Sequence, residues 1–310
     1  MNIVTLTLNP AYDIHCYVEN FEPQRENFAS ITSRDAGGKG VNISRALSYN
    51  GVENLALVVL GEENADDFVK SLKEDSLTFC PITLKGRIRE NITVHTKGSA
   101  ETRISFAGFE ADDSLLEQVA QTVCDKTDAD SIVTVTGSLP LGLNMALVKK
   151  LLAEWKQKGV RIVIDSRSFS LHDLVEIKPW LIKPNQEEIS AYLGREIGSF
   201  DEVIESAREL HGKGIENVMI SLGAKGGLLV NSEGAFVAKP PACKPVSTIG
   251  AGDSSIAGFV AAAKEKKGGA DCLKNAMAYG NAACFTEGTR PPEPQKVKEV
   301  LEQIEFEIKG

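Results

Sequence analysis

Residues 247–254 read Ser-Thr-Ile-Gly-Ala-Gly-Asp-Ser, and an apolar segment at 256–263 follows them. Glycines at 250 and 252 permit a tight turn into a helix, whose first N–H groups lack intrahelical partners and can hold an anion. Asp253, in the same turn, can accept a proton from an attacking hydroxyl. The stretch therefore favours an anion-binding helix start beside a base. A glycine-rich loop in which Asp253 merely caps the helix is the structural alternative.

Before this stretch, short β-branched runs alternate with amphipathic segments. Apolar strands that alternate with helices indicate a mainly parallel sheet covered on both faces. The predicted strands are 3–8, 55–60, 131–136, 160–165, 181–183 and 218–221, and the predicted helices are 41–49, 65–74, 114–124, 145–158 and 202–212.

Two stretches depart from this alternation. Residues 14–34 have alternating, strand-like sequence without a helical pattern, and 91–96 with 101–106 form a hairpin pattern around Lys97-Gly98-Ser99. We expect a single domain over residues 1–310 with a discontinuous β lid at about 14–34 and 87–107. Because an exposed small sheet has unpaired edges, we also expect a homodimer formed through this lid.

Composition limits the classes of partner. Lys and Arg number 34 against 43 Asp and Glu, a net charge of −9, which excludes a globally basic surface for nucleic acid or an anionic membrane. Positive charge that meets an anionic ligand must therefore be local. The sequence has no membrane-length apolar run, no signal-peptide start, and six widely spaced cysteines without zinc or disulfide spacing. We therefore expect a cytoplasmic protein.

A second glycine-rich motif, Asp-Ala-Gly-Gly-Lys-Gly-Val-Asn, occupies residues 35–42. Gly38 allows the backbone to approach a ligand, and Lys39 and Asn42 offer hydrogen-bond donors. The motif lacks the spacing of a P-loop, and a simple turn before a helix is its alternative interpretation.

A third motif, Lys-Pro-Asn-Gln-Glu-Glu, occupies residues 183–188. Asn185 and Glu188 are three residues apart at a predicted strand-to-helix turn, where ligands of open α/β sheets gather. An amide and a carboxylate can hold Mg²⁺ through its waters. Helix capping by Asn185, with Glu188 facing solvent, is the structural alternative.

Three further segments could line the same crevice. Residues 221–227 (SLGAKGG) form a glycine-rich turn, 136–140 (TGSLP) end a strand, and Arg87, Arg89 and Asn91 precede the predicted hairpin. Paired arginines suit phosphate recognition, whereas ordinary surface charge is the alternative for any one of them.

The ordered set of motifs resembles the phosphofructokinase B family of ribokinase-like carbohydrate kinases. It comprises NPAYD at 9–13, GGKGVN at 37–42, RxN at 89–91, GSLP at 137–140, KPNQEE at 183–188, SLGAKGG at 221–227 and STIGAGDS at 247–254. The resemblance covers residues 6–290. It implies a three-layer α/β/α fold with a mainly parallel central sheet and a small β-sheet lid, and ATP-dependent phosphoryl transfer to a sugar hydroxyl with Mg²⁺ and a monovalent cation such as K⁺.

The same resemblance assigns roles to individual residues. Asp253 matches the catalytic base, and the amides of Gly250, Ala251 and Gly252 match the anion hole. The positions that match the acceptor site are Asp13, Asn27, Gly38, Lys39, Asn42, Arg89 and Ser138. The positions that match the ATP site are Lys183, Asn185, Ser221, Gly223, Gly226 and Asn281, with Asn185 and Glu188 matching the magnesium motif.

The motifs at 9–13 and 247–254 resemble the branch that phosphorylates sugar phosphates, so the expected acceptor is fructose 1-phosphate. Tagatose 6-phosphate and fructose 6-phosphate are same-class alternatives, because Thr93 stands where fructose 1-phosphate kinases commonly have lysine and residues 287–290 (EGTR) resemble the 6-phosphate branch. A non-catalytic nucleotide-binding regulator is the alternative from another class, which the intact Asp253 disfavours. A Rossmann dehydrogenase is disfavoured because GxGxxG is missing after the first strand.

Overall fold

The computed structural model describes residues 2–97 and 101–309. Strands and helices alternate along most of the chain, and the strands form one large sheet and one small sheet. The hairpin turn expected at Lys97-Gly98-Ser99 lies partly outside the described residues.

The large sheet has ten strands in the order β14-β13-β12-β11-β10-β9-β8-β1-β4-β5. Strands β11 to β5 in this order are parallel, whereas β12, β13 and β14 pair antiparallel at one side. The central strands are buried apolar runs, as expected where helices cover both faces. Their bounds are β1 Ile3–Thr7, β4 Leu55–Gly61, β5 Phe79–Leu84, β8 Ile132–Thr136, β9 Arg161–Asp165, β10 Leu181–Ile182, β11 Asn217–Ser221, β12 Gly227–Asn231, β13 Gly234–Lys239 and β14 Glu305–Lys309.

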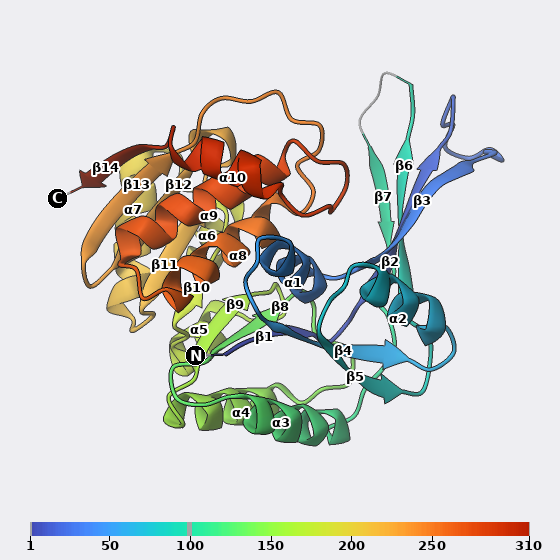
Figure 1. Cartoon of the computed structure of the whole chain (residues 1–310), viewed down its shortest axis with the longest axis horizontal. Coiled ribbons are helices and arrows are strands. Elements are labelled where there is room, and N and C mark those ends of the chain that lie inside the picture. Colours follow the sequence, from blue (N-terminus) through green and yellow to red (C-terminus); the bar gives the residue numbers. More distant parts are fainter. Residues whose placement is uncertain (1, 98–100, 310) are drawn as a thin grey trace.

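Helices cover the two faces of the large sheet in two groups (Figure 1). The group α3 to α7 packs on one face and the group α1, α8, α9 and α10 on the other, so the three-layer α/β/α prediction is confirmed. The bounds are α1 Lys39–Tyr49, α2 Ala65–Glu74, α3 Ser114–Lys126, α4 Met145–Gln157, α5 Leu171–Ile177, α6 Gln186–Leu193, α7 Phe200–Gly212, α8 Ala251–Lys264, α9 Gly269–Ala283 and α10 Pro294–Leu301.

The small sheet projects from the main body (Figure 1). Its order is β3-β2-β6-β7, with bounds β2 Ala11–Tyr17, β3 Ser30–Gly37, β6 Arg89–His95 and β7 Thr102–Ser105. Strands β2 and β6 run parallel, and the outer pairs run antiparallel. A third apolar cluster, which includes Tyr12, Phe68 and Ile88, joins its base to α2 and β4.

The structure differs from the sequence-based expectations in the small sheet and in several elements that were not predicted, among them β5, α5, α9 and α10. The alternating pattern at 14–34 does not form one continuous strand region, because residues 18–29 connect β2 to β3 without strand structure. The antiparallel strands β12 to β14 were not predicted, since their short runs lack the strand-helix alternation used to find the others. No helix within the described residues is long and apolar enough to cross a membrane.

Candidate active site

The motif at 247–254 forms the beginning of α8. Gly250 precedes the helix at φ +77°, a left-handed conformation that glycine adopts without strain. The first N–H groups of α8 have no acceptor one turn earlier within the helix, so they can receive an anion. Asp253 lies in this first turn and is only 8% exposed.

Asp253 is connected to α1 through a buried polar chain. The Asn42 side-chain amide donates to Asp253 Oδ2 at 2.9 Å. Arg45 donates to Asn42 Oδ1 at 3.4 Å and forms a 2.6 Å ion pair with Asp75. Burial raises the pKa of Asp253 to about 6, although Lys39 and the hydrogen bond from Asn42 both oppose the rise. This pKa suits a group that takes a proton near neutral pH.

A buried carboxylate, Asp165, lies between two lysines beside this turn. Lys39 Nζ is 2.8 Å and Lys183 Nζ 3.8 Å from Asp165 Oδ2. Burial alone would raise the pKa of Asp165, but the lysines outweigh it and lower the pKa. Lys183 Nζ also lies 3.3 Å from the point where a Cβ on Gly252 would stand, so its charge is held over the start of α8.

A cavity of about 480 Å³ opens at the carboxyl ends of the parallel strands, between the large and small sheets. It is lined by Thr7 at the end of β1, by Thr136 at the end of β8, and by residues of β2, β6 and β7. The predicted residues that line it are Asp13, Gly38, Lys39, Asn42, Arg89, Ser138, Glu188, Gly250 and Asp253. A cavity of about 510 Å³ at the opposite ends of the strands contains none of the predicted residues.

The small sheet contributes polar groups to the 480 Å³ cavity. Asn91 donates to Asp13 Oδ1 at 3.0 Å, and burial raises the pKa of Asp13. The Arg89 guanidinium donates to the carbonyl oxygens of Phe106 at 2.9 Å and Asn9 at 3.3 Å. Within the described chain, three buried atoms of this group have no hydrogen-bond partner: Asn9 Oδ1, Arg89 Nε and Asn91 Oδ1. Buried polar atoms are normally satisfied, so this wall of the cavity fits a ligand with several hydroxyl or anionic oxygens.

Residues of the third motif lie at the beginning of α6. Asn185 and Glu188 form a reciprocal capping box, with hydrogen bonds of 2.8 and 3.1 Å. Glu188 also accepts from Arg167 Nε at 3.1 Å and lines the 480 Å³ cavity. Asn185 instead lines an adjoining open hollow with Ser221 and Gly223. The capping alternative is thus correct for Asn185, while Glu188 faces the cavity rather than open solvent.

Six predicted residues line neither hollow: Asn27, Lys183, Gly226, Ala251, Gly252 and Asn281. Asn27, in the 18–29 connection, hydrogen-bonds Glu22 and the Arg25 carbonyl and does not line the cavity. Gly226 is in the β11–β12 hairpin turn, and Asn281 on α9 donates to the Pro241 carbonyl at 3.2 Å. The sequence reasoning missed Asp165, whose only signal was its place at the end of a buried strand.

A family model for pfkB carbohydrate kinases, described as "pfkB family carbohydrate kinase", matches residues 4–296. The chain belongs to this family. The pfkB chain is 35% identical to the 1-phosphofructokinase of Haemophilus influenzae over 84% of its own length and 83% of that protein. It is 29% identical to the ATP-dependent 6-phosphofructokinase isozyme 2 of Escherichia coli over 94% of each chain.

The solved structures similar to this pfkB chain include phosphofructokinase-2 from Escherichia coli in complex with substrates and products. That structure has a TM-score of 0.90 and 27% identity, and the match covers 97% of this chain and 99% of the other. Phosphofructokinase-2 was also solved in complex with potassium and as a tetrameric inhibited form.

A pfkB kinase requires ATP and a divalent metal ion, and the residues present fit such an ion. Glu188 presents carboxylate oxygen, the ligand that hard cations prefer, to the 480 Å³ cavity, and its capping partner Asn185 lines the second hollow. Among the described residues no three His, Cys, Asp or Glu side chains are grouped to enclose a metal. This donor set fits an ion held mostly by water and phosphate oxygens.

Proposed function

We propose that the chain transfers the γ-phosphoryl group of ATP to a hydroxyl of a ketohexose phosphate, converting fructose 1-phosphate to fructose 1,6-bisphosphate. The observation that carries this proposal is the placement of Asp253 at the start of α8, in one cavity with Arg89 on the small sheet. Asp253 can activate a hydroxyl, and Arg89 can hold a phosphate at the other side of the cavity.

In the proposed reaction Asp253 takes the proton of the acceptor hydroxyl. The hydroxyl oxygen then forms a bond to the γ-phosphorus as the bond to the bridging oxygen of ADP breaks. The amides of Gly250, Ala251 and Gly252 stabilise charge on the transferring group, because they are preorganised at a helix start. Asp13, with Asn91, orients the sugar hydroxyls, and Gly38, Lys39, Asn42 and Ser138 complete the acceptor wall.

Two lysines provide the positive charge that an overall acidic protein needs here. Lys183 lies over the start of α8, and Lys39 lines the acceptor cavity. Asp165 holds both in place and compensates their charge before ligands bind. Magnesium, held through water by Glu188 and Asn185, would neutralise charge on the ATP phosphates when bound.

We place the nucleotide at the hollow beside the acceptor cavity. Asn185, Ser221 and Gly223 line it, and the backbone of Ser221 pairs with that of Asn185. By family resemblance, Gly226 and Asn281 are also proposed to contact ATP. Closure of the small sheet over both ligands would exclude water and limit ATP hydrolysis.

A monovalent cation is proposed next to the anion hole. Thr289 packs against Gly250, where an added Cβ would lie 3.4 Å from Thr289 Cα. Thr289 also lines the acceptor cavity. Potassium is the proposed ion, since phosphofructokinase-2, a structural neighbour, was solved with it.

Acceptor choice is tested by measuring kcat/KM for fructose 1-phosphate, fructose 6-phosphate and tagatose 6-phosphate side by side. We expect fructose 1-phosphate to give the highest value, in agreement with the similarity to curated 1-phosphofructokinases. A higher value for either 6-phosphate would overturn the acceptor assignment and leave the kinase assignment standing. Absence of phosphoryl transfer to all three would favour the non-catalytic regulator.

A homodimer through the small sheet is proposed as the assembly. Several large apolar side chains on or beside this sheet are exposed, and Phe28 is 84% exposed. Exposed apolar groups on a sheet with free edges favour cover by a second copy. Light scattering at micromolar concentration is expected to give the mass of a dimer, and a monomer mass would contradict the proposal. The other exposed apolar side chains on or beside this sheet are Tyr17, Phe21, Ile31, Ile104 and Phe106.

A further inference from the structure

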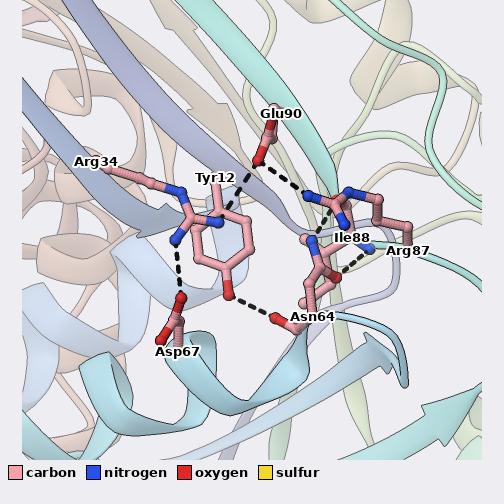
Figure 2. Close-up of polar contacts among 7 residues, drawn as sticks. All are labelled: Tyr12, Arg34, Asn64, Asp67, Arg87, Ile88 and Glu90. Atoms are coloured by element: carbon pink, nitrogen blue, oxygen red, sulfur yellow. Dashed lines mark hydrogen bonds and ion pairs between the residues drawn. The ribbon is translucent and has the colours of Figure 1, made fainter. Parts of the chain in front are cut away.

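The two strands that carry the proposed acceptor residues Asp13 and Arg89 are both hydrogen-bonded near their base to one residue of the main body, Asn64. Asn64, just before α2, donates from Nδ2 to the Ile88 carbonyl at 3.1 Å. Its Oδ1 accepts from the Ile88 backbone N–H at 2.8 Å. Both polar groups of the Ile88 backbone are therefore held by Asn64 (Figure 2). Ile88 is fully buried and directly precedes Arg89.

The backbone of Asn64 holds the second strand. The Tyr12 hydroxyl donates to the Asn64 carbonyl at 2.7 Å, and Tyr12 directly precedes Asp13. The Tyr12 ring is 2% exposed and meets the Phe68 ring edge-on at 5.4 Å, so the tyrosine is fixed against α2. One residue thus contacts the positions immediately before both acceptor residues.

The Asn64 side chain makes these contacts and does not cap its own helix, α2. It occupies the N-cap position of α2, where an asparagine side chain normally accepts from the first turn, but it makes no such bond. Asn144 occupies the same position before α4 and does accept from the Ala146 N–H, at 2.9 Å. The Asn64 side chain therefore bonds to the Ile88 backbone, and the first turn of α2 receives no bond from it.

Further contacts on the same face hold the small sheet against α2. The Arg34 guanidinium lies 3.7 Å over the Tyr12 ring and pairs with Asp67 at 3.2 Å and Glu90 at 3.5 Å (Figure 2). In the pairing of β2 with β6, Tyr12 lies opposite Glu90 and Asp13 opposite Asn91. Successive residues of a strand face opposite sides, so this network lies behind the sheet and the acceptor residues in front.

We propose that Asn64 is a positioning residue for the acceptor site, which fixes the bases of β2 and β6 so that Asp13 and Arg89 face Asp253 at the right distance. It touches neither substrate and acts through the two strands. The inference rests on the proposed function, because it takes Asp13 and Arg89 as acceptor residues.

The test compares Asn64→Ala with Asn144→Ala, which removes an asparagine from the same helix position elsewhere. We expect Asn64→Ala to raise KM for the best sugar phosphate about tenfold, because small displacements of positioning groups weaken productive binding strongly. KM for ATP should stay within about twofold, because the nucleotide hollow is built from other elements. Asn144→Ala should leave both KM values unchanged, whatever it does to the melting temperature.

Asn64→Asp provides a second variant, in which an acceptor for the Ile88 N–H remains but the donor to the Ile88 carbonyl is replaced by a carboxylate oxygen that repels this carbonyl. Its KM for the sugar phosphate should also rise above that of wild type while KM for ATP stays within about twofold, and it preserves the test if the alanine variant does not fold. An unchanged KM for the sugar phosphate, an equal rise in both KM values, or the same rise in Asn144→Ala would overturn the inference. A wild-type protein that phosphorylates no sugar phosphate would instead overturn the proposed function.

Discussion

Replacement of Asp253 by asparagine is expected to lower kcat by about 10²–10⁴-fold, the usual loss when a general base is removed. ATP binding should change little, because the proposed nucleotide residues Asn185, Ser221 and Gly223 lie in the adjoining hollow. Steady-state kinetics with a coupled ADP assay, together with ATP titration by calorimetry, measures the two quantities separately.

The substitution should be well tolerated by the fold. An asparagine can still accept the hydrogen bond from Asn42 that now reaches Asp253 Oδ2. Because burial raises the pKa of Asp253 to about 6, the ionised carboxylate opposes folding at neutral pH, and a neutral side chain removes that cost. The melting temperature at pH 7 should therefore not fall, and a loss of activity cannot be attributed to unfolding.

The pH dependence supplies a second readout of the same base. Protonated Asp253 cannot accept the hydroxyl proton, so wild-type kcat/KM should decline as the pH falls below about 6. The residual activity of Asp253→Asn should lack this limb. Asp271→Asn, in the exposed first turn of α9, is the matched control and should keep wild-type kcat. A kcat above a tenth of wild type in Asp253→Asn would contradict the assignment.

The parts of the fold that the sequence predicted are those in which one chain segment determines its own structure. β1 and β8 are buried apolar runs, and α2 was predicted with the bounds that the structure gives it. β14 could not be found in this way, since its alternating charged sequence gains strand structure only by pairing with β13 at the edge. The structure of such a segment depends on pairing with a distant strand, which the local sequence pattern does not reveal.

The residues of the candidate site also fall into two groups: those with a local sequence signature and those whose contacts are distant in the sequence. Gly250 and Asp253 were found because a glycine turn before a helix has a sequence signature. Asp165 and Asn64 have none, because their roles come from groups 126 and 24 residues away, Lys39 and Ile88. Asn27 was assigned to the site by resemblance alone, but its side chain is used within the 18–29 connection. Residues whose contacts are distant in the sequence can be recognised only from the structure.

Arg89 is expected to contact the phosphate of the acceptor, so Arg89→Ala should raise KM for the sugar phosphate about ten- to a hundredfold. The expectation follows from geometry and charge. Its guanidinium lines the cavity at the small sheet, and its buried Nε has no partner within the described residues. Burial lowers the pKa of Arg89, although Asp13 opposes the change, and an incoming phosphate dianion would compensate a charge held away from water.

A charge-assisted hydrogen bond of this kind contributes roughly 1.5–3 kcal/mol, which corresponds to the expected change in KM. KM for ATP should change little, and this difference separates phosphate binding from general damage to the fold. Arg161→Ala is the matched control, since Arg161 is also a partly buried arginine on a strand but lines the cavity at the opposite ends of the strands. It should leave both KM values unchanged.

Acceptors without phosphate complete the test of Arg89. Unphosphorylated fructose should be a poor substrate for wild type, and Arg89→Ala should reduce kcat/KM for it by much less than for fructose 1-phosphate. The reason is that the deleted group interacts with a phosphate that fructose does not carry. If the variant lost the same factor on both acceptors, Arg89 would be acting on the position of the small sheet, through its bonds to the carbonyls of Phe106 and Asn9, and not on the phosphate.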